Sequence, residues 1–114
     1  MRYIVLLKSP QMTNPPPPEL MDAIMRLGDE ATQAGALLDT AGLSPSAAGA
    51  RVQLAGGQLS VTDGPFAEAK EMISYALYQV SSKEEAVEWA SRFMRLHRDL
   101  WPGWEGEADV LKLY

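Results

Sequence analysis

The chain contains no cysteine, which excludes disulfide bonds, thiolate metal sites and a cysteine nucleophile. It has a single histidine, His97, without clustered partners, so the sequence predicts no metal site and no cofactor. No apolar run approaches the roughly 20 residues that a membrane span requires. The apolar run at the N-terminus is also too short for a signal peptide. We therefore expect a cytoplasmic protein that does not bind membranes.

Basic residues are scarce as well. Ten Lys and Arg stand against fifteen Asp and Glu, which gives a formal net charge of -5 at pH 7. Proteins that bind nucleic acid usually present a basic face, so we expect no nucleic-acid partner. A glycine-rich phosphate loop is also missing, because Gly56 and Gly57 fall in an expected hairpin and not at a helix start. What remains is a chain of 114 residues, 46% of them hydrophobic, which predicts one domain over residues 1–114.

The first half of the chain predicts a strand, a helix and a second strand. Arg2–Lys8 is a continuous apolar run, typical of a central strand. Ser9–Pro18 is a loop that ends in four prolines, the last of which suits the first turn of a helix. Glu19–Ala34 carries apolar residues at spacings of three and four, which predicts a helix. A short strand, Ala36–Asp39, and a turn at Gly42–Pro45 follow.

The second half predicts four more strands and one more helix. The helix starts at Ser81–Glu85, where Ser81 with Glu84 or Ser82 with Glu85 can form a capping box, and it ends before Pro102. The two strands around Ala55-Gly56-Gly57 are expected to pair as a β-hairpin. The four segments expected as strands are Ala50–Leu54, Gln58–Thr62, Met72–Val80 and Ala108–Leu113.

This order of elements predicts an α+β fold of the ferredoxin-like kind, two split β-α-β halves with an inserted β-hairpin. Two helices would cover one face of an antiparallel sheet and leave the other face apolar and exposed to water. A contiguous apolar face of this kind usually marks a contact surface. A second copy related by two-fold symmetry would bury it, so we expect a homodimer.

Residues 61–71, VTDGPFAEAKE, are the most informative part of the chain. Gly64 tolerates backbone angles that other residues avoid, and Pro65 fixes its own φ and lacks an amide donor. The chain must therefore turn sharply after a strand, and charged side chains follow directly on a stiff segment. This arrangement predicts the region of a functional site without naming a reaction.

Asp63 is the sharpest candidate for chemistry, as an acid-base catalyst or as an anchor for a ligand. The alternative is that its carboxylate only caps amides of its own turn. Lys70 and Glu71 are expected as ligand-binding residues, although they can equally be a solvated flank. Phe66 and Tyr75 are expected to line the same pocket as Asp63 and Lys70, between the sheet and a helix, the alternative for both being a place in the core.

The same segment resembles the DGPF family, a branch of the YCII-related proteins. The family hallmark reads roughly DGPFAETKE, and residues 63–71 depart from it only at Ala69, where the hallmark has threonine. The opening residues 1–7, the stretch Gly42–Ser46 and Arg51-Val52 also resemble the family pattern. The resemblance implies a bacterial protein and a dimeric α+β barrel, in which two ferredoxin-like sheets pack face to face.

The resemblance leaves open whether the chain is an enzyme, because the role of the family is largely unsettled. One hypothesis is a homodimer that binds a small molecule and carries out a cofactor-free acid-base step, lyase- or hydrolase-like. Some members of the wider group have a His and Asp pair proposed as catalytic, but the first half of this chain has no histidine to match. The alternative is a non-catalytic regulatory protein that works with an extracytoplasmic-function sigma factor, and a third hypothesis is an oligomer without a ligand.

Overall fold

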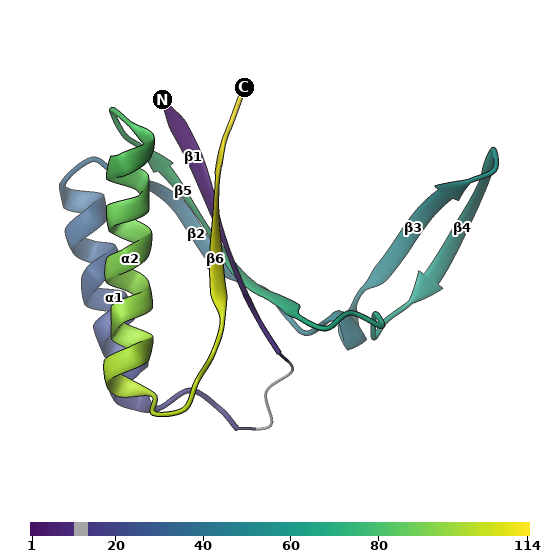
Figure 1. Ribbon diagram of the computed structural model, residues 1–114, viewed down its shortest axis with the longest axis horizontal. Helices are drawn as coiled ribbons and strands as arrows, with labels where there is room; N and C mark the ends of the chain where they lie inside the picture. Colours follow the sequence, from purple (N-terminus) through teal and green to yellow (C-terminus); the bar gives the residue numbers. More distant parts are fainter. Residues whose placement is uncertain (11–13) are drawn as a thin grey trace.

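A four-stranded antiparallel sheet carries two helices on one of its faces, and a two-stranded hairpin projects away from it (Figure 1). The computed structural model describes residues 1–10 and 14–114; the expected loop Ser9–Pro18 therefore lies partly outside the described residues. The elements in chain order are β1 (Arg2–Ser9), α1 (Pro18–Gln33), β2 (Leu37–Gly42), the short 3-10 helix η1 (Ser46–Ala48), β3 (Ala50–Ala55), β4 (Gln58–Asp63), β5 (Glu71–Gln79), α2 (Lys83–Leu100) and β6 (Glu107–Lys112).

The strand order in the main sheet is β2-β5-β1-β6, and each neighbouring pair is antiparallel. This order places the first and third strands of a split β-α-β-β-α-β unit at the centre of the sheet. It is therefore compatible with a ferredoxin-like fold, and the predicted α+β class and order of elements are confirmed.

The ends of the elements differ from the expected ones by up to three residues. Helix α1 begins one residue early, because Pro18 occupies its first turn, where a missing amide donor costs nothing. Strand β2 continues to Gly42, three residues further than predicted, because it pairs with β5 along this stretch. Pairing across the sheet thus extends a strand beyond what its own residues indicate.

The start of α2 shows how the predicted capping box forms. Ser82 is the N-cap, and its hydroxyl accepts a hydrogen bond from the Glu85 amide at 3.1 Å. The Glu85 carboxylate accepts from the amide and hydroxyl of Ser81, at 2.9 and 2.7 Å, instead of from the amide of Ser82. These hydrogen bonds hold the pKa of Glu85 below its usual value.

The core lies between the helices and the sheet. Side chains at alternating positions of β1 point toward the helices, so Tyr3, Val5 and Leu7 are buried. Tyr78 of β5 is opposite Tyr3 and stacks on Trp89 of α2, with ring centroids 6.3 Å apart. The side chains that alternate along β1 and those at helical spacing in α1 and α2 therefore pack together in one apolar layer. Its buried apolar members are Tyr3, Val5, Leu7, Leu20, Ala23, Ala31, Ala36, Tyr78, Val80, Ala86 and Ala90.

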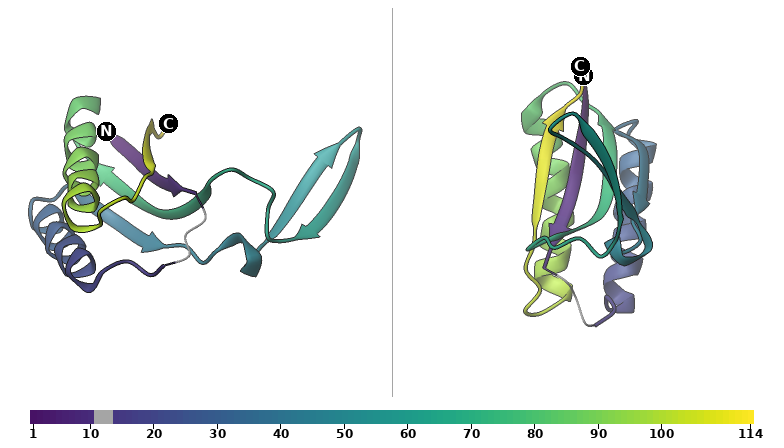
Figure 2. Two further views of the ribbon diagram at one scale, coloured as in Figure 1. Left: turned by 60° about the horizontal axis from the view of Figure 1, so that its bottom comes forward. Right: turned by 90° about the vertical axis from the view of Figure 1, so that its right-hand side faces the viewer.

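The strands β3 and β4 form a hairpin, here called the arm (residues 50–63), that makes a separate two-stranded sheet. Gly56 and Gly57 turn it with φ of 58° and 76°, the left-handed region that a two-residue hairpin turn requires. Figures 1 and 2 show the arm reaching away from the main sheet on the side opposite the helices.

Within the described residues, no helix is long and apolar enough to cross a membrane.

Candidate functional site

The segment that connects the arm to β5 is anchored by η1. The Gly64 amide donates to the carbonyl of Gly49 at 2.9 Å, and the Gly64–Pro65 peptide bond is cis. A Cβ placed on Gly64 would lie 1.6 Å from the carbonyl oxygen of Ser46. Only glycine allows the two backbones to come this close. The glycine in the turn therefore allows residues 46–49 and 64–71 to pack closely at the base of the arm, a region here called the arm root.

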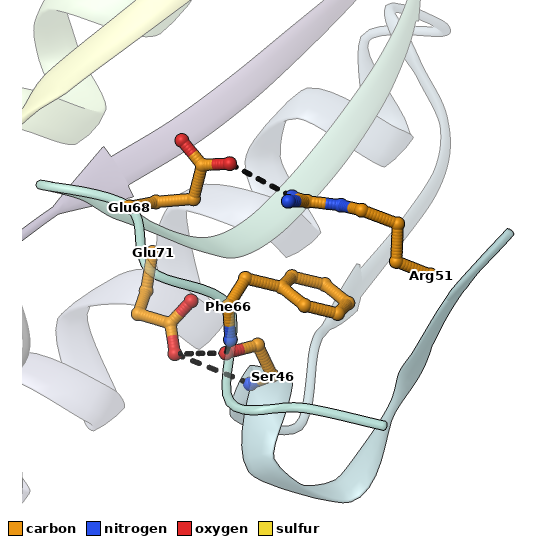
Figure 3. A network of polar contacts seen from close by, with 5 residues as sticks. All are labelled: Ser46, Arg51, Phe66, Glu68 and Glu71. Atoms are coloured by element: carbon orange, nitrogen blue, oxygen red, sulfur yellow. Dashed lines mark hydrogen bonds and ion pairs between the residues drawn. The ribbon is translucent and has the colours of Figure 1, made fainter. Parts of the chain in front are cut away.

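Ser46 is the centre of the polar contacts at this root (Figure 3). Its amide and hydroxyl both donate to Oε1 of Glu71, at 3.2 and 2.7 Å. Its hydroxyl oxygen also accepts from the Phe66 amide at 3.0 Å. One serine thus holds Phe66 and Glu71, which lie 20 and 25 residues further along the chain.

Arg51 covers the ring of Phe66 from the arm side. Its guanidinium carbon lies 4.2 Å from the ring centroid, a cation–π contact, and its Nη2 donates to Glu68 at 2.8 Å (Figure 3). The side chains of Arg51 and Glu68 are 42% and 51% exposed, so this ion pair contributes little to stability. Its main effect is to orient the guanidinium, the aromatic ring and the carboxylate toward one side of the root.

These residues border a cleft of about 810 Å³ between the arm root and the ends of β1 and β5. This volume lies within the range of about 300–1,000 Å³ typical of ligand sites. Leu43, Pro45, Phe66 and Met72 supply apolar surface, while charged side chains supply the polar part. The charged residues that line the cleft are Lys8, Arg51, Glu68, Lys70 and Glu71.

Both lysines of the cleft have carboxylate partners on β6. Lys8 contacts Asp109 at 2.7 Å and Glu107 at 3.7 Å, and the hydrogen bond to Asp109 raises its pKa. Lys70 contacts Glu107 at 2.9 Å, and its hydrogen bond lowers the pKa of that carboxyl. These ion pairs hold both ammonium groups at one end of the cleft.

The structure brings together three of the five predicted site residues, because Phe66, Lys70 and Glu71 all line the cleft. Asp63 ends β4 opposite Ala50 and is not among the lining residues. Tyr75 lies further along β5, and its hydroxyl donates to Asp39 at 2.7 Å, which raises the pKa of the phenol. The catalytic role of Asp63 and ligand binding by all five residues stay predictions.

The cleft also differs in place from the expected one. We expected a pocket between the sheet and a helix, but Phe66 and Lys70 line a cleft at the far end of the sheet, beside η1. The reason is that the turn segment joins the projecting arm to the first residue of β5, away from both helices. Its side chains therefore meet the η1 turn instead of the helical layer.

Sequence reasoning missed Ser46 as the central residue of the site. The local signal was present, because a proline directly before a serine favours a turn, and the Gly42–Ser46 stretch was part of the family resemblance. Its partners lie 20 and 25 residues away, and no local pattern pairs them. The structure pairs the Arg51 guanidinium with Glu68.

His97 serves packing at a distance from the cleft. It is 4% exposed, and its Nδ1 lies 2.9 Å from the carbonyl oxygen of Phe93. Its ring sits between those of Phe93 and Trp104, with centroids 4.7 and 4.4 Å away. Burial lowers the pKa of this imidazole, so the folded state favours its neutral form.

Among the described residues, no group of His, Asp or Glu side chains is arranged to hold a metal ion.

Comparison with known families agrees with these features. The family model of the YCII-related domain matches residues 1–100, most of the chain, including the whole cleft lining. A search of curated proteins found no match. The chain therefore belongs to the YCII-related domain family.

Proposed function

We propose that this member of the YCII-related family, within its DGPF branch, is a homodimer that binds a small polar molecule in the cleft at the arm root. The observation that carries the proposal is the cleft of about 810 Å³ beside Phe66, Lys70 and Glu71. The sequence by itself predicts these three residues as ligand contacts. Ser46 and Arg51 complete the set, because they hold Glu71 and Phe66 in place.

The lining suggests the chemistry of the ligand. Phe66, Leu43 and Met72 offer a flat or apolar part of the ligand a surface to pack against. Lys70 offers an ammonium donor, and Glu68 offers a carboxylate acceptor. A molecule with an apolar body and both donor and acceptor groups at one end, such as an amino acid, meets these requirements.

The proposed function further includes a cofactor-free acid-base reaction on such a ligand. Asp63 is the predicted catalyst, and it lies just before the cleft residue Phe66 in the chain, separated from it by Gly64 and Pro65. The reacting part of a ligand must therefore extend from the cleft toward the end of β4. Loss of turnover in Asp63→Asn, with binding retained, is the expected result for this role.

The homodimer is supported by the face of the sheet opposite the helices. Ile4 is opposite Leu111 and Leu77, and Leu6 is opposite Tyr75 and Asp109, so apolar side chains gather at the centre of this face. Leu111 is 51% exposed in the single chain. Packing two such faces together, as in a dimeric α+β barrel, would remove this apolar surface from water.

Thermal-shift measurements with a panel of amino acids, carboxylic acids and aromatic metabolites test the binding proposal. A ligand stabilises the folded state by RT ln(1 + [L]/Kd), about 2.7 kcal/mol at a hundred times Kd. The shift is expected in the wild type and to be strongly reduced in Phe66→Ala and in Lys70→Ala. Lys83→Ala is the matched control, because Lys83 begins α2 and does not line the cleft. Equal shifts in Lys70→Ala and Lys83→Ala for every compound would rule the cleft out as the site.

A further inference from the structure

The arm is the most exposed part of the molecule. All residues of β3 and β4 are exposed except Arg51, which is half-buried. The radius of gyration is 15.8 Å, whereas a compact domain of this length has one of roughly 13 Å. Figure 2 shows that the arm projects from the rest of the molecule as an isolated two-stranded ribbon.

The register of the arm gathers its large aliphatic side chains on one face. Val52 is opposite Val61 and Leu54 is opposite Leu59, and residues directly opposite in an antiparallel pair share a face. The four side chains are 69%, 68%, 69% and 73% exposed, in the order named. Along each strand they alternate with polar residues, among them Gln53 and Ser60. Such alternation is typical of strands with one face buried and one in water.

An arm of this kind is poorly stable by itself. An isolated two-stranded hairpin is marginally stable at best in water, and it requires further strands or a packed apolar face. Among residues 1–10 and 14–114, no segment of the same chain buries the four aliphatic side chains. The structure therefore lacks the surface that covers the arm.

We propose that this surface belongs to a second copy of the chain, so that the arm of each protomer packs against its partner. The inference rests on the proposed homodimer and deepens it. Each aliphatic side chain carries roughly 60–120 Å² of apolar surface, so a face about 70% exposed offers roughly 170–340 Å². Two arms, together with an equal area of the surfaces they cover, would bury roughly 700–1,400 Å² in total. A stable interface buries about 1,200–2,000 Å².

The arms alone thus only approach the size of a stable interface, and the remainder must come from a surface on the same side of the molecule. The open face of the main sheet meets this condition, because the arm leaves the sheet on the side opposite the helices (Figure 1). That face carries Leu111 and the apolar centre around Ile4 and Leu77. A second copy brings both kinds of surface, because it exposes the same aliphatic arm and the same sheet face.

The charge of the arm argues against a membrane as the covering surface. Arg51 is the only cation in residues 50–63, and it is paired with Glu68. Binding to anionic lipids requires clusters of Lys and Arg beside the apolar face. The net charge of -5 opposes contact with such a surface as well.

The root of the arm favours docking with little loss of conformational freedom. Gly64 is bonded to Gly49, and Ser46 ties Phe66 to Glu71, so the direction of the arm is set before a partner arrives. A preorganised element loses less entropy on binding than a free loop. The partner would also meet the arm beside the cleft, which links dimerisation to the proposed binding site.

Sedimentation equilibrium of arm variants tests the inference. Leu54→Ser/Leu59→Ser changes one directly opposed pair on the apolar face, and Gln53→Ser/Ser60→Thr changes the neighbouring pair on the polar face. Each buried leucine that is lost weakens association by about tenfold or more, and a dimer of the first variant loses four leucines, two from each arm, so its Kd should rise at least about 10,000-fold. The second variant should dimerise like the wild type. Equal dimer Kd values for both variants and the wild type would overturn the inference.

Hydrogen exchange in the wild type supplies a readout that does not depend on a variant folding correctly. The cross-strand amides of the arm should be protected above the dimer Kd and exchange freely below it. Protection that does not change with protein concentration would overturn the inference. Added anionic vesicles should leave the exchange of a dilute sample unchanged, and protection by vesicles alone would overturn it in favour of a lipid surface.

The sheet-face variant Leu111→Ser separates the two levels of the proposal. Weaker dimerisation in this variant, without any effect of the arm variant, keeps the homodimer and removes the arm contact. Weaker dimerisation in the arm variant alone keeps the arm contact and removes pairing through the sheet face. A wild type that stays monomeric at millimolar concentration overturns both.

Discussion

Replacing Gly64 by alanine should break the root of the arm while leaving the main sheet intact. The added Cβ would lie 1.6 Å from the carbonyl oxygen of Ser46 and 2.5 Å from its carbonyl carbon. Ordinary contacts at these atoms begin near 3.4 Å, so the two backbones must separate by well over an ångström. Such a shift breaks the hydrogen bond from Gly64 to Gly49 and disturbs the one from Phe66 to Ser46.

The magnitude follows from two contributions. Overpacking of this kind costs about 1–3 kcal/mol, and each lost hydrogen bond costs about 0.5–1.5 kcal/mol. We therefore expect the free energy of opening the arm root to fall by about 2–4 kcal/mol. The amides of Phe66 and Ser46 report it directly, because their partners lie across the root. Their hydrogen exchange should become about 30- to 1,000-fold faster.

Gly49→Ala is the matched control for this experiment. A Cβ on Gly49 would lie 3.5 Å from the same carbonyl oxygen, which is an ordinary contact, and the backbone there is extended. Exchange at Phe66 and Ser46 should change less than about threefold in this variant, as for a substitution without a special mechanism. If the two alanine variants behave alike, close approach at Gly64 does not hold the root together.

Three further predictions concern pH, the serine at the arm root and the core. Burial lowers the pKa of His97, so the folded state favours the neutral imidazole and the unfolded chain binds the proton first. The free energy of unfolding, measured by urea denaturation between pH 5 and 8, should therefore fall as the pH drops below the ordinary value of 6.5. The variant His97→Gln should show no such slope. Ser46→Ala should accelerate hydrogen exchange at the Phe66 amide by the loss of about 1–2 kcal/mol, and Ser60→Ala on the arm should not. Leu20→Ala should lower the free energy of unfolding by about 2–5 kcal/mol, because this side chain is fully buried, and a cost as small as that of Met25→Ala on the exposed side of the same helix would contradict the core assignment.

The candidate site divides into residues that local pattern could find and residues that it could not. Phe66, Lys70 and Glu71 follow a turn that any Gly-Pro pair would make, so their closeness to one another was predictable. Their position beside η1 was not, because it depends on Ser46, which lies 25 residues before Glu71. Tyr75 illustrates the opposite outcome: it lies four residues after Glu71, yet its hydroxyl bonds to Asp39 on a neighbouring strand.

The amino-acid sequence by itself determined the order of the elements, the two helix starts to within a few residues through Pro18 and Ser82, and the two-residue turn of the arm. These features depend on a few neighbouring residues, whose backbone preferences and periodicity act locally. Only the tertiary structure decided that β2 extends to Gly42 and that Ser46 bonds to Glu71 and Phe66, which line the cleft. It also decided that the arm leaves the sheet with its aliphatic face exposed. Each of these depends on hydrogen bonds and packing between segments far apart in the chain, which no local pattern records.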